Sequence, residues 1–236
     1  MTVTSAAVPV RHEPPSTVRV RGALAVVAGG GESARVYERF GRRLAVDGYV
    51  VAVFEAAASD GAARWLAEQE HAPRILVGSD RGAAAVLALA AAGAEADGII
   101  VAGTPAGPAG EAWAEPSLRT ACPVHLGVLG DPVARAGAPA SEGAVPEVAV
   151  PDAAALRTIT APVLAIHGGA DALAPFAAVR EILAALPQLE LVETVDGLHD
   201  ALNDQSHRSV AATIVLWLER LRGAGIPHPI VRKATT

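Results

Sequence analysis

Three side chains that could do chemistry together are spread along the chain: Asp80, in the stretch GSDRG, then Asp171 and His199. A carboxylate can attack an electrophilic carbon, an imidazole can transfer a proton, and a second carboxylate can orient that imidazole. These residue types predict nucleophilic catalysis, provided that the fold brings the three side chains together.

Alternating strands and helices are predicted to position these residues. Apolar runs with the length of buried strands occur at 23–28, 49–54, 74–78, 98–103, 162–168 and 189–195. Helical patterns are predicted at 33–47, 61–70, 82–92, 174–186 and 206–222. This alternation predicts an α/β fold, with a mostly parallel central sheet and helices on both faces. Ligands bind at the carboxyl ends of the strands in such sheets, where Asp80, Asp171 and His199 would all lie.

The segment 104–160 interrupts the alternation, because it is rich in Pro, Gly and Ala and has only short helical fragments. We predict that it forms a cap or lid inserted into a single domain spanning 18–222. Residues 1–17 show no periodicity and are predicted to be a flexible arm, and residues 223–236 a tail.

Composition limits the kind of partner. The 236 residues carry a net charge of -6 and a single lysine, which argues against nucleic acid. No window reaches the ~20 apolar residues of a membrane span. Cys122 is the only cysteine and no signal peptide is recognisable, so we expect a cytoplasmic protein. A small-molecule substrate is the expected partner, a homodimer is left open, and no motif for a metal or another cofactor is present.

The stretch GSDRG resembles the nucleophile elbow of the α/β-hydrolase family, in which the nucleophile is exposed on a strand-to-helix turn between small residues. The resemblance implies an α/β-hydrolase fold, with Asp80 where most relatives have a serine. The simpler alternative is a helix N-cap formed by Ser79 or Asp80.

The stretch AGGGES after the first strand, with a tyrosine further on, resembles HGxGEHxxxY of monoacylglycerol lipases and lysophospholipases. The resemblance implies an oxyanion hole formed by the N–H groups of Gly30 and Arg81. It also draws attention to Glu32 as a substrate-binding residue. The sequence departs from the motif at Ala28 and Ser33, where those relatives have histidines. A plain glycine turn is the alternative.

The stretch HGGADALAP resembles the family motif HGxxDxxxP, which implies that Asp171 is the acid of a catalytic triad. The family has its catalytic histidine before the last helix, where His199 stands. The order of nucleophile, acid and histidine supports this assignment. Asp200 is a competing acid, and His207 is expected to be structural.

An aspartate nucleophile implies a different reaction from that of a serine. Attack on an ester would give a reactive anhydride, whereas attack on a saturated carbon with a leaving group gives an alkyl ester that water can cleave. This is the chemistry of epoxide hydrolases and haloalkane dehalogenases. The stretch DRG is also similar to the GHDRG elbow of fluoroacetate dehalogenases, which implies that Arg81 holds a substrate carboxylate.

The cap segment offers several contacts for a substrate. Trp113 is expected to line the pocket, and His125, Arg119 and Asp131 are candidates for an acid or leaving-group contact. Epoxide hydrolases use cap tyrosines for this purpose, but both tyrosines of this chain lie outside the cap.

The leading prediction is an enzyme that opens an epoxide or similar electrophile, as in natural-product biosynthesis. A serine-type esterase or lysophospholipase using Ser79 is an alternative. A member of the fold that catalyses rearrangement or cyclisation, or no reaction, is another.

Overall fold

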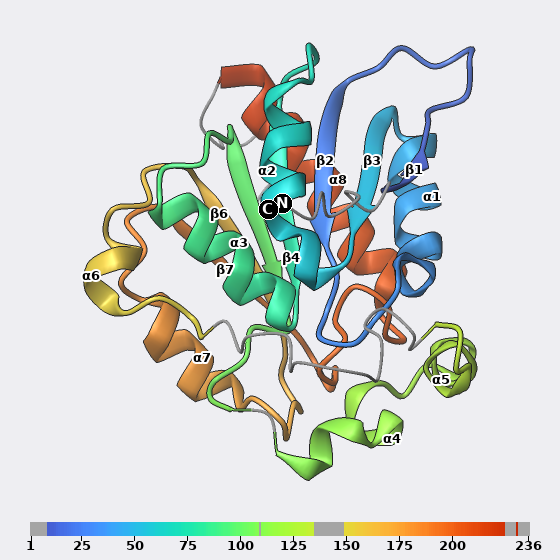
Figure 1. Ribbon diagram of the computed structural model, residues 1–236, viewed down its shortest axis with the longest axis vertical. Helices are drawn as coiled ribbons and strands as arrows, with labels where there is room; N and C mark the ends of the chain where they lie inside the picture. Colours follow the sequence, from blue (N-terminus) through green and yellow to red (C-terminus); the bar gives the residue numbers. More distant parts are fainter. Residues whose placement is uncertain (1–8, 109, 135–148, 225–229, 231–236) are drawn as a thin grey trace, which may run out of the picture.

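The structure, a computed structural model, describes residues 9–108, 110–134, 149–224 and 230. Its centre is a seven-stranded sheet of order β1-β3-β2-β4-β5-β6-β7, in which only the β1–β3 pair is antiparallel (Figure 1). The strands are β1 (Val10–His12), β2 (Gly22–Val27), β3 (Tyr49–Phe54), β4 (Arg74–Ser79), β5 (Gly98–Ala102), β6 (Val163–Gly168) and β7 (Leu189–Thr194). The predicted parallel α/β architecture is confirmed.

Strand β1 corrects the prediction of a flexible arm over 1–17. Residues Val10 and His12 pair with Val53 and Val51 at the edge of the sheet. This strand has only three residues and is mostly exposed, so backbone pairing holds it and no hydrophobic pattern reveals it. Residues 1–8 of the arm lie outside the described residues.

Helices cover both faces of the sheet. One face carries α1 (Glu38–Val46) and α8 (His207–Ala224), and the other carries α2 (Ser59–Ala67), α3 (Arg81–Ala91) and α7 (Phe176–Leu183) (Figure 1). The helix predicted from residue 33 begins as a 3₁₀ turn, η1 (Ala34–Tyr37), before α1. A second 3₁₀ turn, η2 (Ala56–Ala58), precedes α2.

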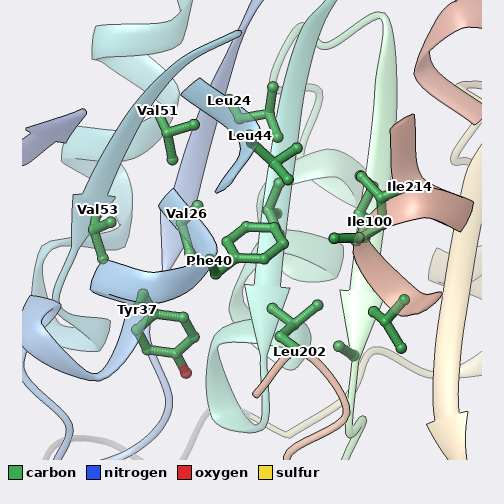
Figure 2. Close-up of a cluster of buried hydrophobic side chains, with 14 of the residues drawn as sticks. Leu24, Val26, Tyr37, Phe40, Leu44, Val51, Val53, Ile100, Leu202 and Ile214 are labelled. Atoms are coloured by element: carbon green, nitrogen blue, oxygen red, sulfur yellow. The ribbon is translucent and has the colours of Figure 1, made fainter. Parts of the chain in front are cut away.

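Two apolar clusters, one on each face, explain why the strands read as continuous hydrophobic runs. Figure 2 shows Leu24 and Val26 of β2 on the same face as Phe40 and Leu44 of α1. The alternate residues of β2 belong to the cluster on the opposite face. Burying each such leucine stabilises the fold by about 1.5–3 kcal/mol. Both faces of the sheet are therefore occupied, and chemistry is restricted to its ends.

The predicted cap segment contains four short helices, η3 (Glu111–Ala114), α4 (Pro116–Arg119), α5 (Pro123–Gly130) and α6 (Ala153–Leu156). Figure 1 shows α4 and α5 together at one end of the sheet. The remaining cap residues, 109 and 135–148, lie outside the described residues, as do 225–229 and 231–236 of the tail. Of the helices in the described ranges, none has the length and apolar character that crossing a bilayer requires.

Candidate active site

The turn between β4 and α3 is a tight elbow. Asp80 at its apex has φ 54° and ψ −125°, a conformation that costs about 1–3 kcal/mol for a residue with a side chain. A Cβ atom on Gly78 would lie 2.6 Å from the Cα of Ala83, and one on Gly82 would lie 2.6 Å from the carbonyl oxygen of Ala28. Glycine is therefore required on both sides of Asp80, as the elbow motif predicted.

The two oxygens of the Asp80 carboxyl group have different surroundings. Oδ2 accepts a hydrogen bond of 3.0 Å from the backbone N–H of Gly30. Oδ1 lies 3.9 Å from Nε2 of His199, and neither of these two atoms has a hydrogen-bond partner among the described residues. Arg81 begins α3, where backbone N–H groups have no acceptor within the helix. The predicted oxyanion-hole residues thus flank the carboxylate, which keeps one oxygen free.

A second carboxylate fixes the imidazole. Nδ1 of His199 donates to Oδ2 of Asp171 at 2.7 Å. The other oxygen of Asp171 accepts from the backbone N–H groups of Leu173 and Ala174 at 2.9 and 3.0 Å. Asp200, the competing acid, bonds to other residues. The ring is therefore oriented with Nε2 towards Asp80.

The protonation of the site departs from that of free side chains. Burial raises the pKa of Asp80 to about 7, against the opposing charges of His199 and Arg119. Burial alone would lower the pKa of His199, but the bond that its Nδ1–H donates to Asp171 outweighs this and the pKa is raised. Burial alone would raise the pKa of Asp171, but the imidazoles of His167 and His199 outweigh this effect and the pKa is lowered. The charges of Asp80 and His199 act on each other: His199 lowers the pKa of Asp80, and Asp80 raises that of His199.

Glu32 does not fit the predicted substrate-binding role. It is 2% exposed, and its Oε2 accepts from the Tyr37 hydroxyl at 2.6 Å and from the Gly29 N–H at 3.1 Å. Its Oε1 forms an ion pair with Arg119. Glu32 is engaged within the protein and fixes the glycine loop beside Asp80.

Two of the cap candidates belong to the same buried network. The guanidinium group of Arg119 donates to Oδ1 of Asp200 at 2.8 and 3.1 Å, and Nε2 of His125 lies 2.8 Å from Oδ2 of Asp200. Asp131 follows α5 and is partly exposed. None of the three cap candidates lines the large cavity described next. Sequence could not reveal this network, because it joins residues about 80 positions apart.

A cavity of about 810 Å³ opens beside the elbow. Asp80 and Arg81 lie at this cavity, together with Trp113, as predicted for these residues. Its walls are the loop 105–108, the segment 149–153 and part of α7, and they are mostly Pro, Ala, Val and Ile.

Three charged residues of the cavity wall, Asp152, Arg157 and Glu181, were not predicted. They belong to the segments around α6 and α7 and follow no strand-end motif, so no pattern in the sequence indicated them. Within the described ranges, no group of three or more His, Cys, Asp or Glu side chains could hold a metal ion.

Trp113 lines the cavity and also contacts the imidazole of His199. Its ring meets that of His199 edge-on, with ring centroids 4.4 Å apart. The guanidinium carbon of Arg119 lies 5.6 Å from the centre of the indole ring. Nε1 of Trp113 is buried without a hydrogen-bond partner in the described part of the chain.

Ser79, the nucleophile required by the esterase alternative, is the last residue of β4 and is 4% exposed. Neither Ser79 nor Tyr37 lines the large cavity, and the imidazole of His199 faces Asp80.

Solved structures match this fold, although no protein-family model and no curated protein matches the sequence. A monoacylglycerol lipase from Paleococcus ferrophilus has a TM-score of 0.70 and 19% identity, over 89% of this chain and 98% of that chain. A soluble variant of monoglyceride lipase from Saccharomyces cerevisiae has a TM-score of 0.73 and 15% identity, over 89% and 90%. The esterase domain of a Rhodothermus marinus protein has a TM-score of 0.61 and 20% identity, over 91% and 92%. The chain therefore has the α/β-hydrolase fold, as predicted, while the aspartate nucleophile stays a prediction.

Proposed function

We propose that this protein is a hydrolase-fold enzyme in which Asp80 attacks an electrophilic saturated carbon, with an epoxide as the favoured substrate. One observation carries the proposal. Asp80 stands at the apex of the elbow with one oxygen held by the Gly30 N–H and the other free and facing His199. Attack requires an ionised carboxylate with an unpaired oxygen. Oδ1 is unpaired, and a pKa of about 7 leaves part of the Asp80 carboxyl group ionised at neutral pH.

In the first step, Oδ1 of Asp80 forms a bond to the carbon, and the carbon–oxygen bond of the epoxide breaks. In-line attack leaves the departing alkoxide on the far side of the carbon from Asp80. The alkoxide takes a proton from water in the cavity, which leaves a hydroxide ion for the second step.

In the second step, Nε2 of His199 removes a proton from water, and the resulting hydroxide adds to the ester carbonyl of Asp80. The Gly30 and Arg81 N–H groups stabilise the oxyanion. Collapse expels the product oxygen, which takes the proton from His199 and leaves Asp80 as a carboxylic acid. That acid gives its proton to the hydroxide formed in the first step, and Asp80 returns to its carboxylate form. Asp171 keeps the imidazole oriented and stabilises its charge during both transfers.

The cavity supports a bulky and mostly apolar substrate, such as a natural product. A volume of about 810 Å³ is at the upper end of the range for small-molecule sites, and the walls are largely aliphatic. We assign Arg81, at the cavity, to a polar or anionic group of the substrate.

An ester hydrolase is the second candidate, favoured by the names of the structural neighbours, which include two lipases and an esterase domain. In this chain it would require Ser79 to reach the substrate, or Asp80 to act as a base towards water.

Two substitutions separate the candidates, with styrene oxide and p-nitrophenyl butyrate as probes. We expect Asp80→Asn to abolish epoxide opening and Ser79→Ala to retain it. Loss of ester hydrolysis in Ser79→Ala, with no epoxide activity in the parent protein, would favour the esterase. Ser79→Ala is the matched control because it is adjacent to Asp80 and removes only a hydroxyl group.

A further inference from the structure

A second histidine, His167, contacts the acid of the proposed triad. It lies in β6, is 1% exposed, and its Nε2 is 2.7 Å from the carbonyl oxygen of Ala174 and 2.9 Å from Oδ2 of Asp171. A carbonyl oxygen can only accept a hydrogen bond, so Nε2 must carry the proton. Nδ1 is buried and has no partner among the described residues, which is consistent with a neutral ring.

The Nε2–H group of His167 thus donates to Ala174, and Nε2 also lies 2.9 Å from the Asp171 oxygen that holds the imidazole of His199. Oδ2 of Asp171 accepts from Nδ1 of His199 at 2.7 Å, and the two imidazole rings are nearly perpendicular with centroids 6.3 Å apart. Through Ala174, His167 also fixes the end of the loop whose N–H groups bind the other oxygen of Asp171. Both oxygens of the acid therefore depend on this side chain, one directly and one through the loop.

We propose that His167 is a positioning residue that holds Asp171, and through it His199, in the reactive arrangement. Its role in turnover rests on the proposed function, but its effect on the Asp171–His199 bond does not. Without the His167 donor, the carboxylate of Asp171 and the loop to Ala174 lose their anchor, and the bond to His199 loosens.

The charged groups that face His199 are Asp171, Asp80 and Asp200, and all three carboxyl groups raise its pKa. Loosening the Asp171 contact removes the strongest of these influences. The pKa of His199 should then fall towards that of a free histidine. If Oδ2 of Asp171 stayed in place without the His167 donor, this oxygen would become more basic. The pKa of His199 would then rise instead.

Three variants test this. The amide nitrogen of Gln reaches the position of Nε2, so His167→Gln keeps the donor. The amide of Asn reaches only the position of Nδ1, which has no described partner, so His167→Asn loses it. His167→Leu also removes the donor. If the Leu variant fails to fold, the Gln and Asn variants, both amides, still carry the comparison.

The first readout needs no substrate: proton NMR of the His199 Nδ1–H and its titration in protein labelled with ¹⁵N-histidine. We expect the downfield Nδ1–H signal and the raised pKa in the parent and in His167→Gln. In His167→Asn we expect the signal to be lost by exchange and the pKa to fall. An unchanged signal and pKa in His167→Asn, or a rise in the pKa, would overturn the proposal.

The second readout is turnover of styrene oxide. Misplacing the imidazole should lower kcat on the order of 10²-fold in His167→Asn, with KM little changed and with most activity kept in His167→Gln. Equal kcat values in the Asn and Gln variants would also contradict the proposal. Absence of any turnover in the parent would count against the proposed function, while the NMR result would still decide the role of His167.

Discussion

Oδ1 of Asp80 and Nε2 of His199 face each other across 3.9 Å, and neither atom has a hydrogen-bond partner among the described residues. Buried polar atoms are nearly always paired, so an unpaired oxygen on Asp80, a residue that lines the cavity, indicates a site where a ligand completes the bonds. The strained backbone at Asp80 marks the same place. Asp80, the residue proposed to react, therefore destabilises the folded protein, and its effect on the free energy of unfolding can be measured.

The first prediction concerns the stability cost of Asp80. Its pKa is raised from 3.8 to about 7 by burial, so the folded state keeps a proton that the unfolded state loses between these values. Stability must fall as the pH rises through this window and level off above about 7. Asp80→Asn removes the cost of ionising this buried carboxyl group, and asparagine tolerates a positive φ. We expect it to be more stable than the parent by about 2–4 kcal/mol at pH 8, and about equal at pH 4.

Urea denaturation at pH 4, 6 and 8 measures this difference. Asp200→Asn is the control of opposite sign, because Arg119 and His125 outweigh burial and lower the pKa of Asp200 to about 2. Its carboxylate contributes stability above the unfolded pKa, so this variant should lose stability at pH 8. A loss of stability in Asp80→Asn at pH 8 would contradict the account.

The second prediction concerns Arg119, which is buried between Glu32 and Asp200. Removing its charge leaves two buried carboxylates without their partner, so we expect Arg119→Met to cost about 3–5 kcal/mol in chemical denaturation. Arg42→Met is the matched control. Arg42 forms an exposed i,i+4 pair with Glu38, and such pairs contribute about 0.3–0.5 kcal/mol. Equal effects of the two substitutions would show that the buried network does not stabilise the fold.

The third prediction concerns the glycines of the elbow. Gly82→Ala would force a Cβ into the backbone of Val27 and Ala28 at the end of β2, so we expect a misfolded protein or one that unfolds several degrees earlier. Gly127→Ala, in helix α5, meets open space and should stabilise the protein by about 0.5–1 kcal/mol. Thermal unfolding compares the two variants. A Gly82→Ala protein as stable as its parent would mean that the turn is looser than described.

The fourth prediction concerns the second step of the proposed reaction. With styrene oxide, His199→Ala should still form the ester on Asp80 but fail to hydrolyse it, so intact-protein mass spectrometry should detect an adduct of the probe's mass. His207→Ala is the matched control, since His207 bonds only to the backbone carbonyl of Asp204 at the start of α8. It should turn over normally with no adduct. An unmodified His199→Ala protein would argue against a covalent intermediate.

The candidate residues at the carboxyl ends of the strands could be predicted from the sequence. Asp80 and Asp171 follow buried strands and His199 follows the partly buried β7. Parallel strands bring their carboxyl ends together, so the proximity of the three residues could be anticipated. Contacts between segments that are far apart in the sequence could not be predicted. Glu32 is an example: its motif suggested contact with substrate, and only its partner Arg119, from the cap, shows that it is engaged elsewhere. Strand β1 was missed because three mostly exposed residues carry no periodic pattern.

The most direct measurement of the central claim is a single turnover of styrene oxide in heavy-oxygen water, followed by mass spectrometry of the peptide that contains Asp80. If Asp80 is the nucleophile, water attacks its ester carbonyl, so the account predicts heavy oxygen in the Asp80 carboxyl group and none in the first diol released. Heavy oxygen in the diol, with an unlabelled Asp80, would contradict it.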